Sequence, residues 1–216
     1  MANISPASGL MTAAARERLR PLGLAQRGRS RIWIDDHGWW IGIAEFPSPR
    51  WSQGSGLTVG VMWLWQDFAH LAFDFAERVR PTEEFRNQIQ FTTVAAGLAQ
   101  EAAQRVEEFR NRFGGLDAVA ESLAERPGRP GYLWGDFNAG VAAALTGRTE
   151  VTRQRLDRVS KEDPVAEWIE QAHEVACQVA DIAHDTDAVH DWARARIASC
   201  SRRLSLAELP NPLDIA

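Results

Sequence analysis

The sequence predicts an α+β fold, in which an antiparallel sheet of four or five strands is covered by helices and followed by a C-terminal all-helical lobe. The first observation is that apolar residues alternate with a period of two between residues 31 and 65, a stretch that holds six of the nine tryptophans. The second is that the apolar period becomes three to four residues from Phe91 onward. The third is a break rich in proline and glycine at 126–131, after which every pattern is helical.

These observations also predict how the chain is divided. We expect an α+β domain with the tryptophan-rich sheet at 1–126, a helical lobe packed on it at 131–209, and an irregular tail at 210–216. A chain of 216 residues can bury a hydrophobic core without disulfides or metals.

The first predicted element is a helix from Ser5 to Arg20. Ser5 is a suitable N-cap, Pro6 is tolerated in the first turn, and Pro21 ends the helix. Residues 24–29 are a candidate short strand that leads into the tryptophan-rich stretch.

A β-hairpin is predicted next, because two alternating stretches flank the sequence Asp35-Asp36-His37-Gly38. If these four residues form the loop, one face of the hairpin is continuously apolar. The expected cross-strand pairs are Ile34 with Trp39 and Ile32 with Ile41. Gly38 is then expected at positive φ.

A third strand is predicted at 57–65, after a connection at 47–56. Both of its faces are apolar, which favours a position inside the sheet. Alternation of Leu71, Phe73 and Phe75 favours a fourth strand, although the window 66–78 also fits a helix.

Helices are predicted from Phe91 to the end of the lobe. The first, Phe91 to Phe113, has an apolar stripe that includes Leu98 and Val106 and is expected to cover the sheet. The others are expected at 116–124, 134–146, 150–160 and 163–203. The last is expected to start with Pro164 in its first turn and to bury a stripe made of Val165, Trp168, Ile169, Ala172, Ala176, Val179 and Ala183.

Composition and hydropathy argue against a nucleic acid or a membrane as a partner. The chain is 45% hydrophobic and 25% charged, with a formal net charge of −5, so a nucleic acid is disfavoured as a partner. We expect no leader segment and no membrane span, because no apolar run approaches the roughly 20 residues that a bilayer requires. Two cysteines, Cys177 and Cys200, are too few for a disulfide framework, and together these features favour a cytoplasmic protein without a cofactor.

Three tryptophans are candidate binding residues. If the isoleucines of the hairpin face the helices, Trp33 and Trp40 face the opposite side of the sheet. Trp51 lies in a loop of prolines, glycines and serines that offers it little apolar company. We expect these residues to bind a protein partner or a small apolar ligand, unless the helical lobe packs over them.

A metal site is the alternative. The side chains of His184, Asp187, His190 and Asp191 are all potential ligands of a divalent metal, and a helix would bring several of them to one side. This cluster would make the protein a metal-dependent, hydrolase-like enzyme, although its spacing matches no established ligand signature. The sequence assigns no catalytic residue.

Three short segments carry a resemblance to known proteins. They are Leu19-Arg-Pro-Leu-Gly-Leu24, Gly28-Arg-Ser-Arg-Ile-Trp33 and Gly60-Val-Met-Trp63. With the first helix, they resemble a loose set of uncharacterised bacterial domains of unknown function. The resemblance covers about residues 10–125, implies an α+β fold and brings no catalytic residue; some members of that set are thought to be immunity or regulatory proteins.

The function expected from the sequence is therefore a cytosolic, non-enzymatic binding or regulatory domain that uses an aromatic face of the sheet. The metal-dependent enzyme remains the alternative.

Overall fold

The computed structural model describes residues 5–49, 53–128, 131–207 and 213. It confirms the α+β class, with an antiparallel sheet and a C-terminal helical part. The chain divides into two compact units: Met1–Met62 with Leu71–Asn111, and Trp63–His70 with Arg112–Ala216. We call these the sheet unit and the helical unit. These units are not separated at 126–131, where the sequence predicts a domain boundary. That boundary stays a prediction about domains that fold independently.

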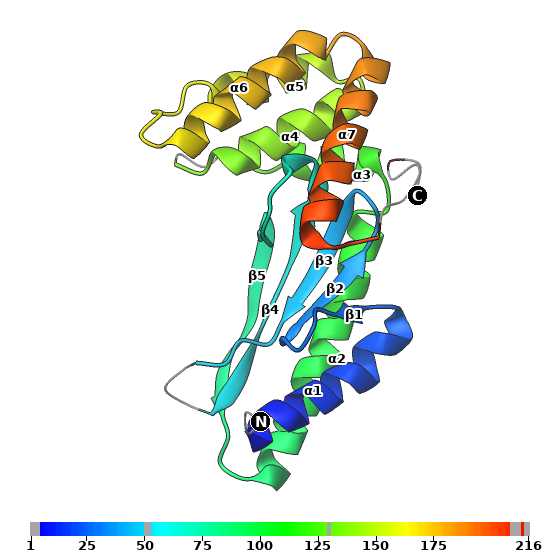
Figure 1. The fold of residues 1–216 in the computed structure, drawn as a ribbon, viewed down its shortest axis with the longest axis vertical. Helices are drawn as coiled ribbons and strands as arrows, with labels where there is room; N and C mark the ends of the chain where they lie inside the picture. The colour runs from blue at the N-terminus through cyan, green and yellow to red at the C-terminus, as the bar shows by residue number, and fades with distance from the viewer. Residues whose placement is uncertain (1–4, 50–52, 129–130, 208–212, 214–216) are drawn as a thin grey trace. The chain divides into compact units, whose positions relative to one another are not determined.

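Within the described residues, the sheet has five strands in the order in which they occur along the chain. They are β1 (Ala25–Gln26), β2 (Ile32–Asp36), β3 (Trp40–Glu45), β4 (Gly54–Trp63) and β5 (Phe75–Glu84). Figure 1 shows them side by side as a meander. Both faces of β4 are buried over most of its length, which confirms that it is an inner strand.

The hairpin between β2 and β3 has a different register from the predicted one. Ile34 lies opposite Ile43 and Ile32 opposite Glu45, so the predicted pairs were wrong by four residues. The loop is shorter because Trp39 N donates to His37 O at 3.0 Å, with Gly38 at φ 80° between them, as in a γ-turn. The positive φ of Gly38 is confirmed. Because the register error is an even number of residues, each side chain keeps its predicted face of the sheet.

Two helices complete the sheet unit. The first, α1 (Pro6–Leu19), begins as predicted, since the Ser5 side chain accepts a hydrogen bond from Ser8 N, and it continues into the 3-10 helix η1 (Arg20–Leu22). The second, α2 (Gln88–Arg112), runs along one face of the sheet in Figure 1. Its predicted stripe is confirmed, because Leu98 and Val106 are buried.

The fourth predicted strand exists but begins later than expected, because of its three named residues only Phe75 lies in a strand. Residues 71–74 form no strand, and the chain after β4 forms the 3-10 helix η2 (Leu64–Gln66). The strand that pairs with β4 is β5, whose sequence is rich in charged residues and contains Pro81. An edge strand tolerates proline and needs little apolar pattern, so its sequence gave a weak strand signal.

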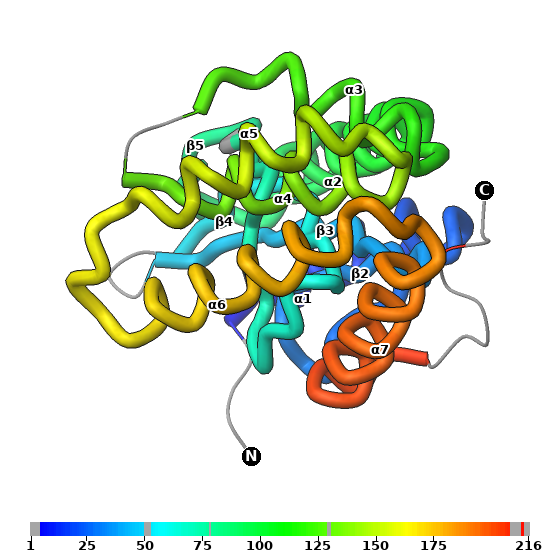
Figure 2. Tube along the Cα trace, turned by 90° about the horizontal axis from the view of Figure 1, so that it is seen from above, coloured from blue at the N-terminus to red at the C-terminus, as the bar shows by residue number. Residues whose placement is uncertain are grey.

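In the described part of the helical unit, η2 and five helices are arranged around α4. They are α3 (Leu116–Ala124), α4 (Leu133–Leu145), α5 (Thr149–Val159), α6 (Glu167–Ile182) and α7 (Thr186–Leu204). Figure 2 traces α5, α6 and α7 from yellow-green to orange. Helix α4 packs against each of the other four and is buried nearly all round. Its Gly140 allows α5 to approach closely, because an added Cβ would lie 2.5 Å from Leu156 Cδ2.

The single helix predicted at 163–203 was wrong, because it is two helices. Asp185 is the N-cap of α7, and its side chain accepts a hydrogen bond from Ala188 N at 3.1 Å. Pro164 lies before α6 rather than in its first turn. Within the described ranges, no helix is long and apolar enough to cross a membrane.

Candidate functional site

Two of the three candidate tryptophans are buried, and the expectation that at least one of the three is accessible stays a prediction. Trp33 is 1% exposed and Trp40 is 2% exposed. The imidazole of His37 covers Trp40, with ring centroids 4.0 Å apart and planes 7° apart. Trp51, the third candidate, lies outside the described residues. The binding face expected on the sheet therefore cannot use Trp33 or Trp40 as open aromatic surface.

The four predicted metal ligands do not form a site in this structure. The break before α7 leaves His184 outside the helix that carries the others. His190 Nε2 lies 2.9 Å from Leu145 O, and Asp191 pairs with Arg194 at 3.0 Å. Across the part of the chain that is described, no three His, Cys, Asp or Glu side chains gather as a metal site. The geometry thus gives no support to a metal site formed by His184, Asp187, His190 and Asp191.

An exposed aromatic surface does exist, and it lies on the helical unit. Among the described residues, four large hydrophobic side chains are exposed, and three of them flank the starts of α4 and α6. These are Tyr132 (38% exposed), Val165 (83%) and Trp168 (50%). We call these three residues, together with the half-buried Trp134, the aromatic surface.

The two tryptophans of the aromatic surface are held against one another. Their rings stack with centroids 6.0 Å apart and planes 22° apart. Trp134 also makes edge-to-face contacts with Phe68, at a centroid distance of 4.9 Å, and with Phe137, at 5.5 Å. Because three aromatic rings surround Trp134, its orientation is fixed, and it supports Trp168 from one side.

Helix geometry explains why these rings are partly exposed. In α4, Leu133 and Phe137 are four residues apart and buried, so Trp134, one residue further along, lies about 100° around the helix from Leu133. In α6, the buried side begins at Ile169, and Trp168 precedes it by one residue. The predicted burial of Val165 and Trp168 was therefore wrong, whereas that of the rest of the stripe, from Ile169 to Ala183, is confirmed.

Carboxylates are concentrated next to the aromatic surface in the chain. They belong to Glu162, Asp163, Glu167 and Glu170, in the loop before α6 and in its first turn. None of the four forms an ion pair with any residue that the structure describes. Glu162 Oε1 accepts a hydrogen bond from Gly131 N at 3.4 Å, which ties this loop to the start of α4. Acidic side chains in the first turn of a helix interact favourably with the helix dipole, so Glu167 and Glu170 also stabilise α6.

A second polar cluster in the sheet unit is structural. Asp35, buried in β2, accepts hydrogen bonds from Arg110 Nε at 2.8 Å and Nη2 at 2.6 Å, and its Oδ2 lies 2.7 Å from His37 Nε2. Burial alone would raise the pKa of Asp35, but the hydrogen bonds from Arg110 and His37 hold it below its usual value. Arg110 Nη2 also donates to Leu22 O at 2.6 Å. The cluster therefore fastens β2, the hairpin loop and η1 to α2.

Sequence spacing did not mark Trp168 as exposed. Trp168 and Ile169 lie four and three residues before Ala172, so both fit the apolar spacing of the stripe, although Ile169 is buried and Trp168 is exposed. No signal in the sequence marked Arg110 as the partner of Asp35 either, since 75 residues separate them.

Comparison of the chain with protein-family models, with curated proteins and with solved structures finds no match. The resemblance to bacterial domains of unknown function remains an expectation from the sequence.

Proposed function

We propose that the protein is a non-enzymatic binding module that takes up a segment of a partner protein on the aromatic surface of its helical unit. The observation that carries this proposal is the half-exposed indole of Trp168, which stacks on Trp134. The partner is a protein segment with apolar side chains and a net positive charge.

The exposed part of the Trp168 indole is a source of binding free energy. A tryptophan buries about 150–250 Å² when fully covered, so half of that area in water forgoes about 2 to 3 kcal/mol at roughly 25 cal/mol per Å². A partner that covers Trp168 recovers this free energy. Because Trp134 already supports the ring, little rotational freedom is lost on binding, and tryptophan is enriched among residues that dominate interface energies.

The charge of the surroundings selects the partner. Carboxylates without an ion-pair partner among the described residues attract lysine and arginine side chains and speed association. An arginine or lysine over the face of an indole adds a cation–π attraction of about 0.5–1 kcal/mol at an exposed site. A small apolar ligand is disfavoured, because Val165 at 83% exposed shows that the surface is open and would leave such a ligand largely in water.

A cytoplasmic location is part of the proposal. Cys177 and Cys200 are both free thiols, which is typical of proteins in a reducing compartment. The supporting observation is the absence of a bond between these two residues, both of which the structure describes.

Titration of the full chain with synthetic peptides tests the proposal. The probe is an amphipathic peptide of lysine and leucine, and the matched peptide has glutamate in place of lysine. We expect the basic peptide to bind with an affinity that falls as salt is raised, and Trp168→Ala to weaken it at least tenfold, or about 1.4 kcal/mol.

The control variant is Ile89→Ala, because Ile89 on α2 is 86% exposed and lies in the sheet unit. It removes an exposed apolar side chain without touching the aromatic surface. Equal binding of both peptides, or equal effects of Trp168→Ala and Ile89→Ala, would remove the basis of the proposal.

A further inference from the structure

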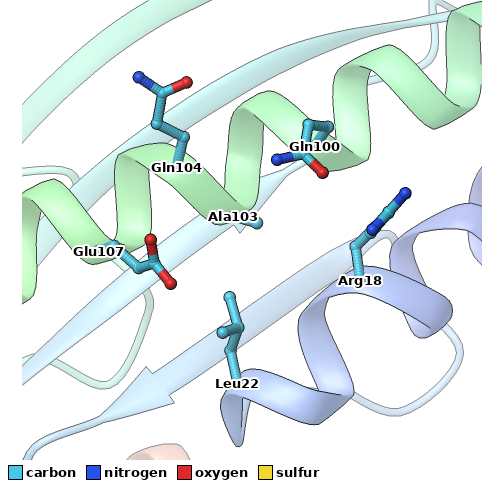
Figure 3. A pocket seen from close by; sticks show the side chains of 6 residues that line it. All are labelled: Arg18, Leu22, Gln100, Ala103, Gln104 and Glu107. Carbon is cyan, nitrogen blue, oxygen red and sulfur yellow. The ribbon is translucent and has the colours of Figure 1, made fainter.

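A groove of about 430 Å³ lies in the sheet unit between the end of α1 with η1 and the middle of α2. Figure 3 shows Leu22 and Ala103 between the two helices, with Arg18 and Glu107 on opposite sides of the groove. Gln100 and Gln104 complete its lining. A volume of this size falls within the range of small-molecule sites, about 300–1,000 Å³, but the groove is open to solvent, because its four polar lining residues are all exposed.

The polar side chains of the groove are available to a ligand. Arg18, Gln100 and Glu107 make no hydrogen bond or ion pair with the residues that the structure describes. Gln104 has one partner, because its Nε2 donates to Glu108 Oε1 at 3.0 Å. A cation, an anion and an amide around an apolar floor therefore have no hydrogen-bond partner among the described residues, and the charge of Glu107 also acts on Arg110.

The floor of the groove is held in place without a ligand. Arg110 donates to Leu22 O at 2.6 Å, and the same guanidinium is fixed by Asp35. Gly23, at φ 89°, ends η1, and Leu24 N bonds back to Leu19 O at 3.2 Å. Because η1 is fastened to α2, a ligand does not have to organise the groove as it binds, which lowers the cost of binding.

We propose that this groove binds a small linear zwitterion, with an anionic group at one end and an ammonium group at the other. The carboxylate of the ligand pairs with Arg18, its ammonium group pairs with Glu107, and Gln100 hydrogen-bonds a polar group between them. The aliphatic part of the ligand covers Leu22 and Ala103. Short peptides with free termini and ω-amino acids share this chemistry.

Titration of the full chain, followed by NMR signals of the Ala103 methyl group and the Arg18 Nε–H group, tests the site. The probes are alanyl-alanine and γ-aminobutyrate, and the capped controls are N-acetyl-alanyl-alanine and alanyl-alanine amide. We expect saturable shifts with at least one zwitterion and at least tenfold weaker binding of both capped peptides. The zwitterion that binds with the higher affinity shows whether the groove prefers a short peptide or an ω-amino acid.

Two variants assign the ends of the ligand. Arg18→Gln is expected to lower the affinity for every probe that has a carboxylate but not for alanyl-alanine amide. Glu107→Gln is expected to lower the affinity for the zwitterions but not for N-acetyl-alanyl-alanine. The matched control is Arg16→Gln, an exposed arginine on the same helix that does not line the groove.

Absence of saturable shifts with both zwitterions would overturn the inference, as would capped peptides that bind equally well. Equal effects of Arg18→Gln and Arg16→Gln would also overturn it. These outcomes are independent of the aromatic surface, because Trp168 belongs to the other unit and Trp168→Ala should leave zwitterion binding unchanged.

Discussion

The indole of Trp168 stacks on the indole of Trp134 with their ring centroids 6.0 Å apart, although half of Trp168 is exposed to water. One ring of this pair is supported by Phe68 and Phe137, and the other is presented at the surface. Trp134 therefore orients the pair, and in the proposed binding mode Trp168 contacts the partner.

Replacement of Trp134 should destabilise the helical unit more than replacement of Trp168. Trp134→Ala removes three aromatic contacts, and we expect a loss of about 2 to 4 kcal/mol in the free energy of unfolding. Trp168→Ala removes a half-exposed ring, with an expected loss of about 1 kcal/mol. Urea denaturation of both variants measures the difference, and a larger loss for Trp168→Ala would contradict these roles.

Leu98→Ala should destabilise the sheet unit strongly. Leu98 lies in the buried stripe of α2, where truncation of leucine to alanine costs about 2 to 5 kcal/mol. Ile89→Ala on the same helix is the control, with an expected change within about 0.5 kcal/mol, because Ile89 is exposed. Thermal unfolding monitored by circular dichroism compares them, and similar melting temperatures would show that the stripe is not core.

Two helical glycines should respond in opposite directions to substitution by alanine. Gly140→Ala places a methyl group 2.5 Å from Leu156 Cδ2 and 2.8 Å from its Cγ, so we expect a loss of about 1 to 3 kcal/mol. Gly97→Ala in α2 meets nothing within 4 Å and should stabilise the protein by about 0.5 to 1 kcal/mol through higher helix propensity. Chemical denaturation measures both, and stabilisation by Gly140→Ala would contradict the close packing of α4 and α5.

Asp35 should make the stability of the sheet unit dependent on pH in the acid range. Its folded pKa lies below the unfolded value of about 4, so its carboxylate contributes stability above that pH. The contribution is lost as the pH falls through the folded pKa, because the protonated acid no longer accepts the charged hydrogen bonds of Arg110.

Arg110→Gln tests this dependence. We expect a lower stability at neutral pH, by roughly 1 to 3 kcal/mol, and a smaller further loss in acid. Arg105→Gln is the control, because Arg105 pairs with Glu108 on the exposed side of the same helix, where a pair is worth about 0.5 kcal/mol. Unfolding curves measured across the acid range distinguish the two, and identical pH profiles would exclude a role for the Asp35–Arg110 pair.

Local patterns predicted much of the fold. The stripe of α2 and the bounds of α3 were correct, because helical periodicity and glycine at a helix end act within a few residues. The hairpin register was wrong because a γ-turn at Gly38 shortens the loop. The predicted and the observed register place the same side chains on the apolar face, so the apolar pattern could not distinguish them. The predicted helix at 163–203 was wrong because Asp185 caps a new helix.

The candidate site was harder to predict. Alternation correctly separated Trp33 and Trp40 from the isoleucines, but it cannot show whether anything covers a face of a sheet. Trp168 is exposed because it lies one residue before Ile169, where the buried side of α6 begins. Trp134, which supports its ring, lies 34 residues earlier in the sequence, and no local pattern predicts that contact.

The most direct test of the aromatic surface is an NMR titration of the full chain with the basic amphipathic peptide, monitored at the indole N–H signals of Trp134 and Trp168. Trp168→Phe and Trp134→Phe assign the two signals. We expect both to shift saturably with a common dissociation constant, while the buried indoles of Trp33 and Trp40 stay unchanged. A peptide that binds without moving the Trp168 signal, or a Trp168 signal that remains constant at every peptide concentration, would contradict the proposal that this surface is the binding site.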